Sequence, residues 1–231
     1  MISDRITFGV EIECVLPSAL VLDASALKLA RGVKPAGWKA VPDGSIEAPA
    51  GFTAVEFVSP KLVGEVGLTA AVAVVEKLAA LGARVNDSCG LHVHISSKGW
   101  ESDADFLLEA FAAVQGKFLA LGGREANQYC QELTRQDRWL EKVNKYQTLT
   151  VWQPGKGAEI RAFAGTLEPE AFRHRLELAL YFWQGLMLGS GNLGGGWDYV
   201  LEVALEDGGA PADLIEWVKA AGLWNDPAAE F

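Results

Sequence analysis

Cysteines are scarce in this chain, basic residues are outnumbered, and long apolar runs are missing. Only three of the 231 residues are cysteine, Cys14, Cys89 and Cys130, and their odd number and scatter do not suit a disulfide framework. The chain has 20 Lys and Arg residues and 30 Asp and Glu residues, which gives a formal net charge of −10. This balance argues against nonspecific binding to nucleic acid or to an anionic membrane. We therefore expect a protein of the reducing cytoplasm.

Signals for membrane insertion or secretion are also missing. The most apolar helical stretch, residues 176–188, is too short to span a bilayer and contains Glu177 and Gln184. Residues 1–5 lack the basic start and apolar core of a signal peptide. Half of the residues are apolar, which is enough for a substantial core. The sequence predicts a single domain, 1–231, and no membrane among its partners.

Apolar periodicity and turn residues predict an α+β fold, because strands and helices follow one another without a regular parallel alternation. We expect a curved antiparallel sheet with helices packed on one face. Residues 124–146 are polar and are predicted to be helical in part. The predicted core covers about 5–188, and 189–231 form a glycine-rich loop and a last helix. The predicted strands are 5–16, 38–41, 54–59, 91–96, 146–152 and 159–164, and the predicted helices are 65–81, 102–121, 168–188 and 212–221.

Two glutamates stand out in the first predicted strand. Glu11 and Glu13 are two residues apart within an apolar stretch, so they point to the same face of the strand while Val10 and Ile12 point to the other. Like charges on one face of an apolar strand repel and are costly to desolvate. A cation should compensate them, and a divalent metal is the leading candidate, although the outer face of an edge strand would also carry such a pair.

The same alternation recurs in later strands. His92 and His94 share one face of residues 91–95, and Glu159 and Arg161 share one face of residues 159–161. Glu56 adds an acid within an apolar strand. Carboxylate oxygens suit Mg²⁺ or Mn²⁺, and both ions tolerate an added imidazole. Taken singly, the histidines could be surface residues or a zinc pair, and Glu159 and Arg161 could form an ion pair.

In these motifs the chain resembles the amidoligases of the carboxylate–amine ligase superfamily, which includes glutamine synthetase and glutamate–cysteine ligase. The resemblance runs in order from residue 5 to about 188. The segments that carry it are Phe8–Glu13, Asp43–Ser45, Val55–Pro60, Cys89–Ile95, Lys145–Tyr146, Glu159–Phe163 and Gly165–Leu167. It implies a glutamine-synthetase-like catalytic domain with ATP and Mg²⁺ or Mn²⁺ as cofactors.

The resemblance also implies residue roles. His94, Lys145 and Arg161 would contact the nucleotide, with Arg161 on its phosphates. Glutamine synthetases carry Asn-Gly before the histidines as a substrate-binding element, whereas here Asn86 is displaced, so the substrate pocket cannot be transferred. The implied metal ligands are Glu11, Glu13, Glu56, His92 and Glu159.

A chemical mechanism fits these residues. A carboxylate is a poor electrophile, so ATP would convert it to an acyl phosphate that an amine then attacks. Arg161 and two metals would neutralise phosphate charge during the transfer. Asp43 is a candidate general base, and an ordinary Asp-Gly turn is the alternative. Arg124 is a candidate ligand for a substrate carboxylate, and a solvated helical face is its alternative.

Three functions stay open at this point. The first hypothesis is an ATP-dependent carboxylate–amine ligase whose partners are small-molecule or peptide carboxylates and amines. The second is a metal-dependent hydrolase that activates water at the histidine and carboxylate cluster and needs no ATP. The third is a non-catalytic binding module that keeps the fold.

Overall fold

The computed structural model describes residues 1–98, 104–134, 145–152, 157–189 and 199–225. Its centre is a seven-stranded sheet with the order β4-β5-β1-β7-β9-β8, in which β6 also pairs with β1. Every pairing of these strands is antiparallel. The strands are β1 (Ile6–Pro17), β4 (Lys39–Val41), β5 (Phe52–Val58), β6 (Leu62–Val63), β7 (Gly90–Ser97), β8 (Leu149–Trp152) and β9 (Gly157–Ala164).

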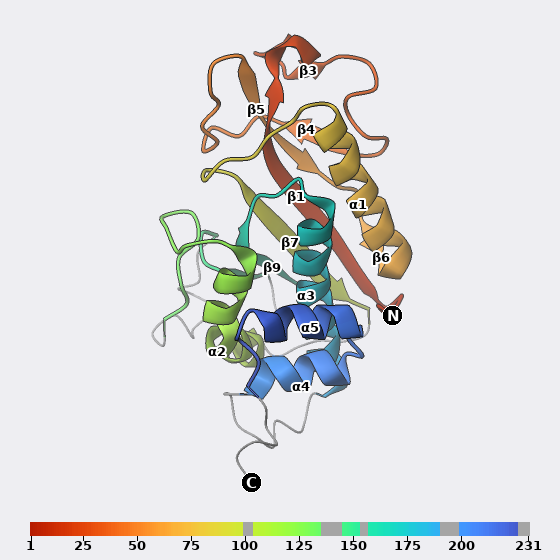
Figure 1. Cartoon of the computed structure of the whole chain (residues 1–231), viewed down its shortest axis with the longest axis vertical. Helices are drawn as coiled ribbons and strands as arrows, with labels where there is room; N and C mark the ends of the chain where they lie inside the picture. The colour runs from red at the N-terminus through yellow and green to blue at the C-terminus, as the bar shows by residue number, and fades with distance from the viewer. Residues whose placement is uncertain (99–103, 135–144, 153–156, 190–198, 226–231) are drawn as a thin grey trace.

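A small lobe follows β1 in the chain. It holds the 3-10 turn η1 (Ser18–Leu20) and a two-stranded sheet of β2 (Val21–Asp23) and β3 (Lys28–Leu29). The lobe lies at the end of the molecule where β1 finishes (Figure 1).

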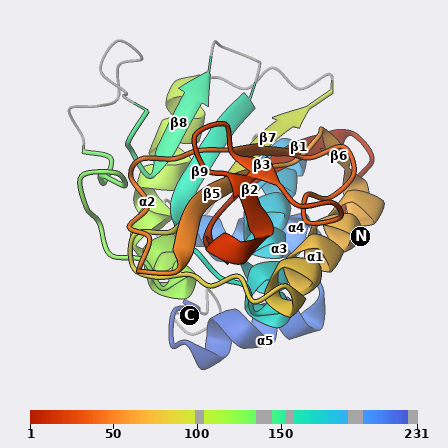
Figure 2. The same ribbon diagram turned by 90° about the horizontal axis from the view of Figure 1, so that it is seen from above.

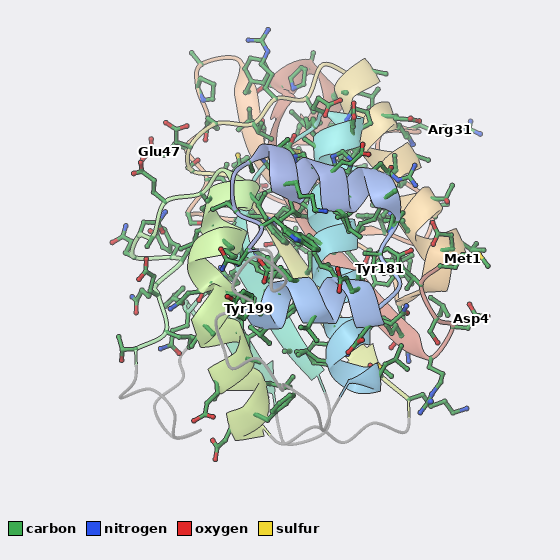
Figure 3. All side chains as sticks on the ribbon, turned by 60° about the horizontal axis from the view of Figure 1, so that its bottom comes forward. Met1, Asp4, Arg31, Glu47, Tyr181 and Tyr199 are labelled. Carbon is green, nitrogen blue, oxygen red and sulfur yellow. The ribbon has the colours of Figure 1, made fainter. Side chains whose placement is uncertain are left out.

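The main helices pack together on one side of the central sheet (Figure 2). Helix α1 contacts β1 and β6, α2 contacts β8 and β9, and α3 contacts β7. Helices α4 and α5 pack on α3 rather than on the sheet, and they lie side by side in Figure 3. The helices are α1 (Gly64–Ala80), α2 (Ala104–Gly122), α3 (Pro169–Leu188), α4 (Val200–Asp207) and α5 (Ala212–Ala220).

Strand alternation explains the two faces of this sheet. Ile6, Phe8, Val10 and Ile12 of β1 are each at most 3% exposed, because they pack into the main hydrophobic cluster of the molecule. That cluster extends through α4 and α5 to Val218. The residues that alternate with these on β1 therefore point to the face of the sheet away from the helices, and the same alternation holds along β7 and β9.

Local sequence sets the ends of the helices. Pro169 occupies the first turn of α3, and the Glu168 side chain accepts hydrogen bonds from the backbone N–H groups of Glu170 and Ala171. Helix α2 ends at Gly122, and the next residue, Gly123, has a positive φ of 62° that a glycine adopts without strain.

The α+β class and the antiparallel sheet agree with the sequence prediction. Of the segment 124–146, which was predicted to be helical in part, the described residues 124–134 and 145–146 contain no helix and form short bridges such as Gln131 with Gln147. The rest of that segment, 135–144, lies outside the described residues. Helix α4 was not predicted, since its eight residues follow a glycine-rich stretch. The predicted helix start at 102, the turn at 153–156 and the loop at 190–196 lie outside the described residues. None of the described helices combines the length and the apolar character needed to cross a membrane.

Candidate active site

The sheet register brings the predicted polar residues together on the face opposite the helices. Glu11 of β1 lies directly across from His92 of β7, and Glu13 lies across from Glu56 of β5. On the other side of β7, His94 lies across from Glu159 of β9. Four neighbouring strands therefore supply one polar site.

Glu11 links the two histidines. Its Oε1 lies 2.8 Å from Nε2 of His94, and its Oε2 lies 3.0 Å from Nδ1 of His92. Burial by itself would raise the pKa of Glu11, but the hydrogen bonds with His92 and His94 outweigh it and hold the pKa well below its ordinary value. Glu11 is therefore an anion at neutral pH, as a metal ligand must be.

His92 lies at the centre of the site and is only 1% exposed. Its Nε2 is buried, has no hydrogen-bond partner among the described residues and lies 3.5 Å from Oε1 of Glu13. The other oxygen of Glu13 accepts a hydrogen bond from the backbone N–H of Gly90. A buried nitrogen without a partner is costly in a finished site, and a bound cation would satisfy it.

Two groups of ligand atoms emerge from this arrangement. One consists of Glu11, His94 and Glu159, and we call it the histidine cluster. The other consists of Glu13, Asp43 and Glu56, and we call it the carboxylate cluster. Within each group, one ligand atom from each residue lies within 4.8 Å of the others.

Both clusters fit divalent cations. Hard carboxylate oxygens, with at most one imidazole, are the ligands that Mg²⁺ and Mn²⁺ accept. Adjacent acids on a partly buried sheet face also repel one another unless cations lie between them.

Asp43 lies beside Glu13 and Glu56 in the site. Its Oδ1 accepts hydrogen bonds from the backbone N–H and the hydroxyl of Ser45, at 2.7 and 2.6 Å. This is the turn chemistry expected for Asp-Gly-Ser, and the turn presents Asp43 to Glu13 and Glu56. The sequence gave Asp43 a possible role as a general base, whereas the geometry groups it with Glu13 and Glu56 as a candidate metal ligand.

Glu56 carries the clearest sign of crowding in the carboxylate cluster. Burial, followed by the nearby charges of Glu11, Glu13 and Asp43, raises the pKa of Glu56 to about 8, while Arg161 acts in the opposite direction. In the absence of metal this carboxyl keeps its proton at neutral pH, and metal binding would release that proton.

Arg161 lies beside the histidine cluster. Its Nη1 donates to Oε1 of Glu159 at 2.5 Å, and its Nε lies 3.4 Å from the carbonyl oxygen of Tyr129. Arg161 thus places a fixed positive charge next to the acids of β1 and β9. The contact with Tyr129 was not predicted; Tyr129 lies in the segment 124–146, which was predicted only to be helical in part.

Arg124 is drawn to the same sheet from the end of α2. Its Nη1 donates to the carbonyl oxygens of Arg161 and Phe163, at 2.8 and 3.1 Å. Lys145 is exposed, and its ammonium lies 4.8 Å from the centre of the Tyr146 ring. The structure therefore brings Arg124 to the site, and the nucleotide contact of Lys145 stays a prediction.

Two pockets adjoin the site. The His94 pocket has a volume of about 330 Å³ and is lined by residues that include Gly9, Val10, Glu11, Val58, Ser59 and His94. The Arg124 pocket has a volume of about 580 Å³ and is lined by residues that include Asp87, Cys89, Arg124, Glu125 and Gly165. Ser59 lies in the motif segment Val55–Pro60 but was given no role from the sequence; its hydroxyl accepts a hydrogen bond from the backbone N–H of Val10.

Comparison with known proteins identifies the family. No curated protein matches the chain. The family model described as "Putative amidoligase enzyme" matches residues 4–183, which include β1 through most of α3 and every residue of both clusters. This agrees with the resemblance drawn from the motifs of the sequence, and the chain belongs to the amidoligase family.

Proposed function

We propose that the chain is an ATP-dependent carboxylate–amine ligase that forms an amide bond through an acyl phosphate. The observation that carries the proposal is the pair of adjacent three-residue ligand clusters on one sheet face, with Arg161 beside them. Family membership supports an amide-forming enzyme. The use of ATP and the likeness to glutamine synthetase are parts of the proposal.

Divalent cations bound to the two clusters would neutralise phosphate charge, which is the main requirement of phosphoryl transfer. The residues of the chain itself do the rest. Glu11 fixes the orientation of both imidazoles through its two oxygens. Arg161, held by Glu159, supplies a positive charge for the group in transfer.

The His94 pocket is the proposed place of the nucleoside. It begins at Glu11 and His94, so a nucleotide lying there would have its phosphates at the histidine cluster. Val58 and Pro60 contribute apolar surface to the wall, which suits a planar base.

The reaction would then proceed in two steps. A substrate carboxylate attacks the γ-phosphorus of ATP and displaces ADP, which gives an acyl phosphate. An amine attacks the acyl carbon, loses a proton to a base and displaces inorganic phosphate, which leaves the amide. We assign Asp43 to the carboxylate cluster rather than to the base, because both Glu13 and Glu56 lie beside it.

The decisive test is nucleotide binding and phosphate release. We expect the purified chain to bind ATP only with Mg²⁺ or Mn²⁺, and to release phosphate when carboxylates and amines are supplied together. Glu11→Ala should abolish both. Glu76→Ala removes an exposed carboxylate on α1 and serves as the matched control.

A wild-type chain that binds no ATP with either metal would refute the ligase. The hydrolase is the second candidate, because both imidazoles face one carboxylate and could instead take zinc. Tightly bound zinc in the purified protein, with hydrolysis that needs no ATP, would favour it.

A further inference from the structure

The segment that contains β3 and β4 carries a local excess of positive charge. Residues 24–42 contain Lys28, Arg31, Lys34 and Lys39 and no Asp or Glu, whereas the whole chain has a formal net charge of −10. Strands β3 and β4 lie at the same end of the molecule (Figure 1). One end of a chain that is acidic as a whole is therefore basic.

A cavity lies within this basic end, and we call it the Lys39 pocket. Its volume is about 590 Å³. Arg31, Lys34 and Lys39 line it, and no acidic residue of the described chain does. Leu27 and Leu29 add apolar surface to the same lining. The pocket therefore complements a partner that is both negatively charged and partly apolar.

Two of the three cations keep their hydrogen-bond donors for a ligand. The side chains of Arg31 and Lys39 are exposed, and the structure records no hydrogen bond or ion pair for them among the described residues. Lys34 has a different role, because its Nζ donates to the carbonyl oxygen of Trp38 at 2.8 Å. Trp38 is 5% exposed and packs into the main hydrophobic cluster, so Lys34 ties the loop before β4 to a fixed point.

The backbone holds one wall of the pocket in a fixed shape. Leu27 has a φ of 44°, in the left-handed region that a leucine rarely adopts, and its side chain is buried. Such a conformation persists only where the surroundings hold it. The turn before it is fixed by Asp23, whose Oδ1 accepts hydrogen bonds from the backbone N–H groups of Ser25 and Ala26. This wall is therefore formed before a ligand binds.

Strand β4, the other wall, is an edge of the central sheet. It ends the strand order, and in the described part of the chain it pairs only with β5. The outer side of an edge strand presents unpaired backbone groups, to which an extended peptide can add as a further strand. A lysine on an edge strand often serves to prevent pairing, which would explain Lys39. It would not explain Arg31 and Lys34, which line the same pocket from the preceding loop.

The register of β4 relates this edge to the carboxylate cluster. Val41 lies across from Glu56, and Lys39 lies across from Val58, which lines the His94 pocket. Opposite residues of an antiparallel pair share a face, so Lys39 and Val41 point to the same face of the sheet as Glu56. A chain added to β4 would lie two strand spacings, about 10 Å, from β5.

From this arrangement we propose that the Lys39 pocket and the outer edge of β4 bind an acidic polypeptide in an extended conformation. Its carboxylates lie on Arg31 and Lys39, its apolar side chains lie on Leu27 and Leu29, and its backbone pairs with β4. Such a polypeptide would be one of the partners that the ligase joins. That role rests on the proposed function, whereas the binding itself does not.

Binding of designed peptides tests the proposal. An eight-residue peptide that alternates Glu and Val is labelled with fluorescein, and its binding to the full chain is followed by fluorescence anisotropy. A peptide with Gln in place of every Glu should bind about 5- to 20-fold more weakly, as for the loss of two or three exposed ion pairs. Methylation of alternate backbone nitrogens of the Glu peptide should weaken binding about fivefold or more, because the strand pairing is then incomplete.

Variants of the chain locate the binding. Lys39→Glu should weaken binding of the Glu peptide about three- to tenfold, and adding Arg31→Glu should bring the loss to about tenfold or more. Neither change breaks a recorded bond, so both variants should fold. Lys98→Glu is the matched control, because this exposed lysine at the end of β7 has recorded hydrogen bonds only through its backbone, and it should leave the affinity unchanged. Glu11→Ala should also bind the Glu peptide as the wild type does.

The outcomes are distinct. Equal binding of the Glu, Gln and methylated peptides, or unchanged binding in the folded variant with both reversals, overturns the inference. Tighter binding of an eight-nucleotide single-stranded DNA than of the Glu peptide also overturns it. If the Glu peptide binds in a Lys39-dependent way but ATP does not bind with Mg²⁺ or Mn²⁺, the peptide surface stands and the ligase function fails.

Discussion

Replacing Glu56 with Gln tests the electrostatic reading of the carboxylate cluster. In the metal-free protein the pKa of Glu56 is raised from 4.5 to about 8, first by burial and then by Glu11, Glu13 and Asp43. The folded protein therefore holds a proton that the unfolded chain releases between these two pH values. Because the folded state binds more protons in this window, the free energy of unfolding falls as pH rises from about 4.5 to 8.

A pKa shift of this size corresponds to about 5 kcal/mol for a fully isolated group. Glu56 is only partly buried, and screening by water reduces the expected loss to about 2 kcal/mol. Glutamine has no proton to lose, so Glu56→Gln should be more stable than the wild type by about 2 kcal/mol above pH 8 and equally stable below pH 4.5. With Mn²⁺ the order should reverse, because the variant loses a charged ligand and with it the stabilisation from binding.

The assay is urea unfolding followed by the fluorescence of the eight tryptophans, from pH 4 to 9, with EDTA and then with Mn²⁺. The Glu76→Gln variant controls for the removal of one negative charge from the surface, and its stability should stay within about 0.5 kcal/mol of the wild type. Glu11 does not obscure the window, because its lowered pKa makes stability fall only towards acid.

One result would refute the reasoning. If the metal-free wild type keeps the same stability from pH 5 to 8, or if Glu56→Gln is the less stable protein at pH 9 with EDTA, the carboxylates do not repel one another. The carboxylate cluster would then be no candidate for a metal.

Three further predictions follow from the packing. In the proposed ligase reaction, Arg161→Gln should lower the turnover number about 10²- to 10³-fold, with a smaller change in the KM for ATP, because a group that stabilises developing charge is lost. Steady-state phosphate release measures both constants. Gly122→Ala should destabilise the fold by about 1–3 kcal/mol in urea, because its Cβ would meet the carbonyl oxygen of Ala162. Lys117→Met should cost about 3–5 kcal/mol, because it strips the buried Glu202 of its ion pair at 2.6 Å, and adding Glu202→Leu should restore most of that loss in the same urea assay.

Prediction from sequence succeeded where a pattern is local. The strands around Glu11 and His92 and the long helix that ends at Leu188 were predicted correctly. Their signals, the alternation of polar and apolar side chains and the helical spacing of apolar residues, lie within a few neighbouring residues. The course of residues 124–134 could not be predicted in this way, because their hydrogen bonds go to distant partners. The Gln115 amide, for example, bonds both the N–H and the carbonyl of Leu133, which holds this segment against α2 without a helix.

The sequence by itself determined that Glu11 and Glu13 share one face of a strand, since side chains alternate with a period of two. It could not say which strands adjoin, because pairing depends on contacts between residues far apart in the chain. Only the tertiary structure placed His92 across from Glu11, Glu56 across from Glu13, and Asp43 beside them. The same packing brought Arg124 next to Gly90, which also borders His92. No sequence motif shows this contact between the Arg124 pocket and the polar site.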